Sequence, residues 1–524
     1  MKKSNIRFYQ FIMLFLAFGS GTATMAQTAD EGLSVAGQSL LKGQRLWLQT
    51  GNAAGTAHDN TRNYSRLQVN YDVQSGDFHR VYTGKTVRDA NIYTEGFVNL
   101  GKAYVWGEFK FTHENVGNAR FNASINDPYR GQPYFVVDSG VQSKWRNQNY
   151  HLRFRAATPV LFRSWTFGLE GTYKAQLAAK QRDPRVDARF FMLQLMPGVT
   201  YSPTYNDVIG VNLRYASVKE ESNMELENYQ VKPHYFELYG LGTAHRGIGT
   251  GRETNYFGNR WGFGLQYEHH MKGWKLLAEL TADKYVENNE ISFTTPKKDS
   301  QLEEKNLGAN IQAMLWGRSL THQVRIGFNR RAVNGIMYLS QNDNTQEKAG
   351  WKVLHQDIRS TYKTTDLSAA YTLLRPRDTE YSWRSDLSVA YQKLDDKYLL
   401  PLSVKNSENI YLRLNLERNI IVGRSMNRRL LLAVGGMWKD ALRGEYRYTG
   451  ANANLVTVRE MEPLDQAYLT ADAWGANGAI TYSQLLKSQS KVNGFAQLAF
   501  DYAHTNAAMF NHRSRVNVTL GVNF

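Results

Sequence analysis

The chain has 524 residues, of which 42% are hydrophobic and 13% aromatic, and its 63 Lys plus Arg outnumber its 47 Asp plus Glu. It contains no Cys, which excludes a disulfide framework, a Cys-ligated metal site and thiol catalysis. The mean hydropathy of −0.51 is too low for a helical membrane protein. Abundant Gly and aromatic residues together with only 11 Pro favour a large all-β chain.

The beginning of the chain predicts a secretory signal peptide. Lys2, Lys3 and Arg7 precede or flank an apolar run over 8–18, and small residues then lead to a cleavage site after Ala26. A membrane anchor is the alternative, but the apolar run is shorter than the roughly 20 residues that a helical span needs.

The segment over 27–61 precedes the first expected strand. Apolar residues from Leu33 to Leu41 have rough helical spacing, so the segment is either a short helix that enters the barrel as a partial plug or a loosely ordered tail. The expected organisation is a signal peptide over 1–26, this periplasmic or plug-like segment, and a single outer-membrane β-barrel domain over 62–524.

Stretches in which apolar and polar side chains alternate recur along the rest of the chain. A period of 2 over about ten residues, with one apolar and one polar face, is typical of transmembrane β-strands. We count 18 such stretches, within a range of 14 to 18. They lie at 67–73, around 97, and at 105–111, 150–156, 165–173, 191–201, 208–215, 261–267, 276–282, 307–315, 324–328, 367–371, 383–391, 410–416, 430–438, 468–482, 492–502 and 516–524.

The expected connections alternate between short links and long links, the latter including 112–148, 175–190, 219–257 and 331–363. Bacterial barrels have short periplasmic turns and long extracellular loops. In hydrocarbon every backbone N–H and C=O must be paired, and only a closed sheet leaves no edge. The predicted fold is therefore all-β: a closed antiparallel transmembrane β-barrel with both termini in the periplasm.

The C-terminus carries the sharpest local pattern. Val518, Leu520 and Val522 alternate with polar residues, and the chain ends on Phe524. This resembles the signal by which the barrel assembly machinery recognises outer-membrane barrels for insertion, whereas an edge strand of a soluble protein is the alternative. Together with the signal peptide, it predicts the outer membrane of a Gram-negative bacterium as the location.

The polar face of each expected strand is directed into the lumen. Barrels of 16–18 strands are wide enough to hold a water-filled channel, so a pore for small polar solutes is expected. For any single charged residue, a structural ion pair is the alternative. The lumen-lining candidates are Arg153, Arg155, Arg214, Glu268, Glu279, Arg325, Asp386 and Arg413.

Two long loops are candidates for function. The loop 112–148 carries Phe121 and Trp145, which form either a binding surface for a ligand or partner or a contact between loops. The loop 219–259 is rich in glycine and either folds inside the barrel as a constriction or lies on the surface. The constriction candidates are Tyr239, Gly247, Gly249, Gly251 and Arg252.

Enzymatic chemistry finds little support. The sequence lacks the H-E-x-x-H and G-x-S-x-G motifs, and its 12 His are scattered. We therefore expect no enzyme, no metal and no cofactor. The excess of basic residues favours contact with outer-membrane lipid and lipopolysaccharide over contact with nucleic acid.

The stretch WLQTGNAAG over Trp47–Gly55, the signal peptide and the terminal Phe524 together resemble a family of Bacteroides-type outer-membrane β-barrels catalogued as a domain of unknown function. The resemblance implies an accessory role beside a TonB-dependent receptor or surface lipoprotein in nutrient uptake. Two functions stay open: a pore or channel for small polar solutes, and a non-conducting surface-binding or accessory barrel of a TonB-linked uptake system.

Overall fold

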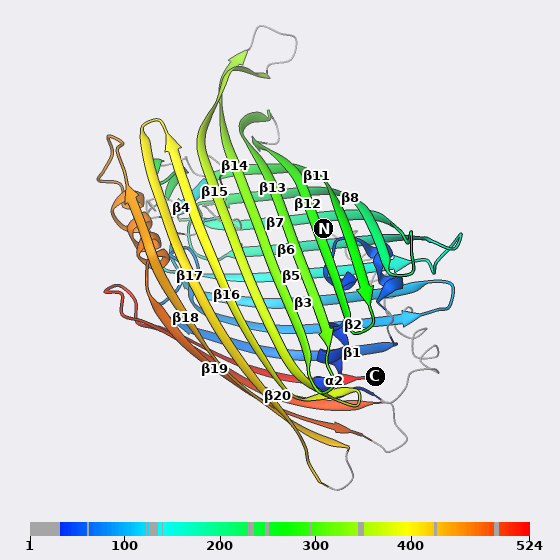
Figure 1. Ribbon diagram of the computed structural model, residues 1–524. Coiled ribbons are helices and arrows are strands. Elements are labelled where there is room, and N and C mark those ends of the chain that lie inside the picture. Colours follow the sequence, from blue (N-terminus) through cyan, green and yellow to red (C-terminus); the bar gives the residue numbers. More distant parts are fainter. Residues whose placement is uncertain are drawn as a thin grey trace, which may run out of the picture.

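Eighteen strands form one closed antiparallel sheet in the computed structural model, which confirms the predicted fold class (Figure 1). Among the described residues, no helix has the length and apolarity that a membrane span needs. The structure describes residues 32–524 except 60–61, 122, 125–130, 132–134, 139, 229, 231–234, 247–250, 293–294, 344–349, 424–426 and 487–491, so the expected signal peptide lies outside the described residues.

The barrel strands pair in chain order, and the last strand pairs with the first. They are β1 (Tyr64–Gly76), β2 (Gly84–Asn99), β3 (Tyr104–Ala119), β5 (Ser143–Ala157), β6 (Trp165–Lys180), β7 (Arg185–Tyr201), β8 (Asp207–Glu225), β11 (Gly251–Met271), β12 (Trp274–Ile291), β13 (Lys297–Trp316), β14 (Thr321–Asp343), β15 (Gly350–Arg377), β16 (Glu380–Leu399), β17 (Leu402–Ile421), β18 (Arg428–Arg447), β19 (Ala473–Leu485), β20 (Asn493–Thr505) and β21 (His512–Asn523).

The closing pair joins β21 to β1 along most of their length. Leu520 lies opposite Val69, and the backbone of Phe524 exchanges hydrogen bonds of 3.0 and 3.2 Å with Ser65. Val518, Leu520 and Val522 occupy alternate positions of β21, and 60% of Leu520 is exposed on the outer wall. Their use, with Phe524, as an insertion signal stays a prediction.

Apolar side chains cover the outer wall of the barrel, and polar ones point inward. Leu213, Phe263 and Leu307 are exposed at outward positions, whereas Asn212 and Gln266 at inward positions are buried. A water-soluble protein buries its apolar side chains and exposes its polar ones, and this barrel does the reverse. The reverse arrangement suits a membrane, because lipid hydrocarbon contacts the apolar outer wall.

Several connections expected to be long are in fact strand. β6 and β7 leave only 181–184 between them, and β14 with β15 occupies most of 331–363. Beyond the bilayer both faces of a strand meet water or loops, so the alternation that marks a strand in the sequence disappears there. Tyr468 was also misassigned: it belongs to a helix, and β19 begins at Ala473.

The residues before the barrel form three short helices inside the lumen, near the end with the short turns (Figure 1). They are α2 (Val35–Gly43), η2 (Trp47–Gln49) and η3 (Ala53–His58). Ser34 caps α2 by accepting a hydrogen bond from the backbone N–H of Gly37 at 3.1 Å. We call Leu33–Asp59 the plug.

The loops at the opposite, long-loop end contain secondary structure of their own. A three-stranded sheet combines β4 (Phe135–Asp138), β9 (Tyr235–Gly240) and β10 (Thr243–Arg246). The connection between β18 and β19 holds the π-helix η4 (Thr457–Met461) and the helix α3 (Glu462–Leu469). We call these five elements the lid.

Candidate functional site

Trp47 is the central anchor of the plug. Its side chain is fully buried, at 0% exposure, and packs with Val208, Leu277 and Met314 on the inner wall. Its indole N–H donates to the Glu268 carboxylate. An apolar body and a satisfied polar edge together make this Trp a specific contact between plug and wall.

Arg155 holds the plug backbone from the other side. Its guanidinium donates to the carbonyl oxygens of Trp47, at 3.0 Å, and of Thr50. The same guanidinium forms an ion pair of 2.6 Å with Glu170, which also binds Arg153 at 2.6 Å. Because Arg155 has no exposed surface, its charge depends on these partners.

Asn52 connects the plug to two neighbouring strands. Its side-chain amide is within 3.1 and 3.2 Å of backbone carbonyls of β7 and β8, and 3.0 Å from the Gln266 carbonyl oxygen. Next to it, the Gly51 N–H donates to Glu279 at 3.0 Å. The plug thus satisfies inward polar groups that would otherwise need water.

Three glycines make room for the plug. Gly168, Gly198 and Gly210 occupy inward positions of β6, β7 and β8. A Cβ atom on Gly198 would lie 2.2 Å from Oδ1 of Asn52, and one on Gly168 would lie 2.3 Å from the Ala54 nitrogen. We call these three residues the glycine cradle. It was not predicted from the sequence, although inward-facing glycines on three consecutive strands are a usable signal.

The first part of the plug is fixed to strands beyond those that hold Trp47. Ser34 donates to Glu380 of β16 at 2.7 Å, and Lys42 forms an ion pair with Glu95 of β2. The plug therefore crosses the lumen from β16 past β2 to the wall formed by β5–β8 and β11–β13.

The lid closes the other end with a hydrophobic core. Phe236 and Leu238 of β9 are buried against Tyr285, Leu302 and Tyr362, which point inward from β12, β13 and β15. Burial of these side chains holds the loops inside the mouth of the barrel. Of the two alternatives for the loop 219–259, β9 lies inside the mouth as part of the lid, and a role in constricting solute passage stays a prediction.

Buried charges fasten α3 to the barrel wall. Lys405 of β17 binds Glu462 at 2.8 Å and also binds Asp465, while Arg80 binds Asp465 at 2.8 Å. Burial raises the pKa of Glu462 despite the nearby Lys405. For Asp465 burial acts the same way, but Lys405 and Arg80 outweigh it and hold its pKa below the usual range.

Replacing Lys405 with Met is expected to loosen the lid. Glu462 and Asp465 would lose their common cation while still buried, and breaking such a network costs about 3–5 kcal/mol. Limited proteolysis of the folded barrel should then cut faster between 448 and 472. Lys397→Met, on an exposed cation of β16, is the matched control; equal cleavage of the two variants would contradict the assignment.

The lumen-lining candidates fall into three groups. Arg155, Glu268 and Glu279 contact the plug, whereas Arg153, Arg214 and Asp386 form ion pairs with other wall residues. Arg325 and Arg413 are inward and exposed. Their role in solute passage stays a prediction.

The loop candidates are distributed over the lid and its base. Tyr239 lies in β9, Gly251 begins β11, and Arg252 binds Glu237 and, at 3.1 Å, Asp299. Gly247 and Gly249 lie outside the described residues. Phe121 and Trp145 are both buried, so of the two alternatives for the loop 112–148 their burial agrees with a packing contact and not with an exposed binding surface. They pack because loop and strand ends fold over one another.

The closed strand pairing and the apolar outer wall define a transmembrane β-barrel. The plug and the lid occupy its lumen. The chain belongs to a family of unknown function, DUF6850, whose model matches residues 53–524. No curated protein matches the sequence.

Solved structures resemble the barrel in outline. The ferric yersiniabactin uptake receptor FyuA from Yersinia pestis is 8% identical with a TM-score of 0.40, over 88% of this chain and 79% of that one. The RagAB peptide transporter is 6% identical with a TM-score of 0.39, over 88% and 86% of the two chains. Acinetobacter baumannii OccAB3 is 9% identical with a TM-score of 0.32, over 88% and 99%. Values this low carry no information on function.

Proposed function

We propose that this protein is a non-conducting, surface-binding accessory barrel of an uptake system in the outer membrane of a Gram-negative bacterium. The observation that carries the proposal is the plug, which crosses the lumen and is held by Arg155, Glu268 and Glu279. A lid with its own core covers the long-loop end as well. The plug and the lid therefore obstruct the lumen at both ends, which favours a closed barrel over a solute-selective pore.

The exposed ribbon of β14 and β15 supplies the working surface. Residues 350–358 of β15 pair only with β14, because pairing with β16 begins at Ser360 (Figure 1). Leu339, Trp351 and Leu354 are 61%, 39% and 53% exposed there. A two-stranded ribbon is marginally stable alone in water, and an unpaired edge with apolar side chains favours addition of a partner strand. The proposed partner is a receptor or lipoprotein chain at the cell surface.

Single-channel recording of the refolded chain in a planar bilayer tests the closed state. We expect verified folded barrel to give no steady conductance, because the plug and the lid both occupy the path. Steady, ohmic conductance of the intact chain would instead establish the alternative, a pore for small polar solutes lined by Arg325 and Arg413.

A photo-crosslinking residue at Leu354 tests the surface. In intact cells we expect a discrete adduct with a neighbouring envelope protein, since Leu354 lies on the ribbon with the unpaired edge. Met509, which is 55% exposed in another loop at the same end, is the matched control. Equal adducts from the two positions, or none from Leu354, would count against the ribbon as the binding surface.

A further inference from the structure

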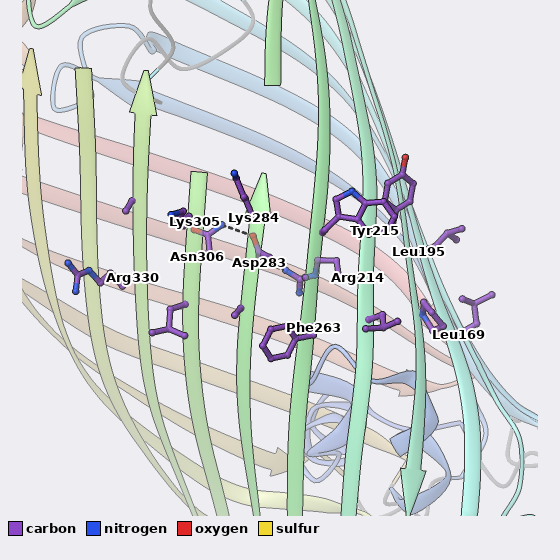
Figure 2. Close-up of a pocket in the computed structure, with 17 residues that line it drawn as sticks. Leu169, Leu195, Arg214, Tyr215, Phe263, Asp283, Lys284, Lys305, Asn306 and Arg330 are labelled. Carbon is purple, nitrogen blue, oxygen red and sulfur yellow. Dashed lines mark hydrogen bonds and ion pairs between the residues drawn. The ribbon is translucent and has the colours of Figure 1, made fainter. Parts of the chain in front are cut away.

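The outer wall has a wide apolar depression of about 1040 Å³ across β6–β8 and β11–β14 (Figure 2). Leu195, Leu213, Phe263 and Leu307 line it from outward positions, and each is exposed. It faces the side of the barrel that meets lipid, so its occupant in a membrane is hydrocarbon.

Three cations line the depression toward its long-loop side: Lys284, Lys305 and Arg330, on the adjacent strands β12, β13 and β14 (Figure 2). Lys284 and Lys305 are directly opposite each other, and Arg330 is diagonal to Lys305 because Lys305 pairs with Ala332. Like charges directly opposite on one face of a sheet repel each other. An anion between them removes that penalty.

The protein supplies few carboxylates to these cations. Among the described residues, the one ion pair of Lys284 is with Glu303 at 3.7 Å, and no hydrogen bond or ion pair joins Lys305 or Arg330 to an acid. A second outward cluster provides a contrast: Lys393 and Arg443 each bind Glu408 at 2.7 Å. The first cluster therefore has positive charge left for an external anion.

The height of the cluster matches a headgroup. Lys284 is ten residues from Trp274 at the short-turn end of β12, which corresponds to about 25 Å along the barrel axis. The apolar band of such barrels is about 25 Å tall. Trp261 lies directly opposite Lys284 and packs against Tyr215 in a tilted arrangement, with 4.4 Å between the ring centroids. Aromatic residues of this kind are enriched at the membrane–water interface.

We propose that this depression and its cationic rim bind lipid A, the phosphorylated glycolipid of the outer leaflet. Its acyl chains occupy the apolar depression, and its phosphates bind Lys284, Lys305 and Arg330. The three cations lie on three adjacent strands, and neighbouring strands are about 4.8 Å apart. They therefore extend over more than the width of one phosphate. This width favours a ligand with two phosphates over a phospholipid with one. The inference rests on the proposed location in the outer membrane, and it is independent of whether the lumen conducts.

Native mass spectrometry of the detergent-purified full chain with added bis-phosphorylated lipid A tests this site. We expect wild type to retain lipid A, and the double variant Lys305→Ser, Arg330→Ser to bind it about tenfold more weakly, as for the loss of one or more charge-assisted hydrogen bonds. The matched control is Lys393→Ser, Arg443→Ser, which removes two outward cations that already have a carboxylate partner. A gel-mobility assay of heated and unheated samples verifies that each variant is folded.

Three results would overturn the proposal: no retention of lipid A by wild type, equal loss in both double variants, or equally tight retention of phosphatidylglycerol. The last result would assign the rim to anionic phospholipid in general. Because lipid binding and conductance are separate measurements, failure here is distinguishable from failure of the closed-barrel function.

Discussion

Gly198→Val is expected to displace the plug from the lumen. A Cβ at this position would already lie 2.2 Å from Oδ1 of Asn52, and a branched side chain there would keep the plug from its seat against β7 and β8. We expect steady single-channel conductance when Gly198→Val is combined with Lys405→Met, which loosens the lid at the other end, and none from wild type or from Lys405→Met alone. A barrel of this strand number is wide enough for a water-filled path once both the plug and the lid are displaced.

Gly478→Val is the matched control for that experiment. A Cβ on Gly478 would meet its nearest neighbour, the Ala433 carbonyl oxygen, at 3.7 Å, and this position does not contact the plug. A second variant that lacks residues 33–59 covers the case in which Gly198→Val does not fold. Closed channels from either folded plug variant in the Lys405→Met background would show that the plug is not what blocks the lumen.

Arg155→Met is expected to cost the folded protein about 3–5 kcal/mol. The change removes a fully buried cation, leaves Glu170 with Arg153 as its ion-pair partner, and frees the carbonyl oxygens of Trp47 and Thr50. Equilibrium unfolding in urea, followed by tryptophan fluorescence in lipid vesicles, measures the difference.

Arg153→Met is the matched control for Arg155→Met. It also removes a cation that binds Glu170, but it leaves the contacts between Arg155 and the plug in place. The Arg153 side chain is 28% exposed, and its hydrogen bonds go to Glu170 alone among the described residues. We expect a loss of about 1 kcal/mol or less for this partly solvated pair. Equal destabilisation by the two variants would mean that Arg155 does not hold the plug.

The arrangement of the plug explains why a large barrel can have a polar wall and still be filled. Inward polar residues such as Glu268 and Glu279 find their partners on the plug rather than in water. Most of these contacts are hydrogen bonds and ion pairs. If the plug moved away, water could take its place as the partner of the polar side chains on the wall. The lid differs, since buried apolar side chains form its core.

The sequence by itself determined the membrane-spanning part of the fold. Each of the 18 expected stretches lies within or overlaps a strand, because the lipid outside and the polar lumen inside impose a period of 2 on every strand separately. A local pattern is enough for such a feature. Where that two-sided environment ends, as in the ribbon of β14 and β15, the pattern disappears and the strand ends were misplaced.

Only the tertiary structure decided what fills the lumen. The spacing of Leu33 to Leu41 indicates a helix, and the sequence left open whether it is a plug or a tail. Arg155 was correctly placed on the inner face, but its partner Trp47 is 108 residues away in the chain, and Glu268 lies a further 113 residues beyond Arg155. Contacts between residues so far apart in the chain form only when the barrel closes around the plug. The local alternation of apolar and polar residues therefore cannot predict them.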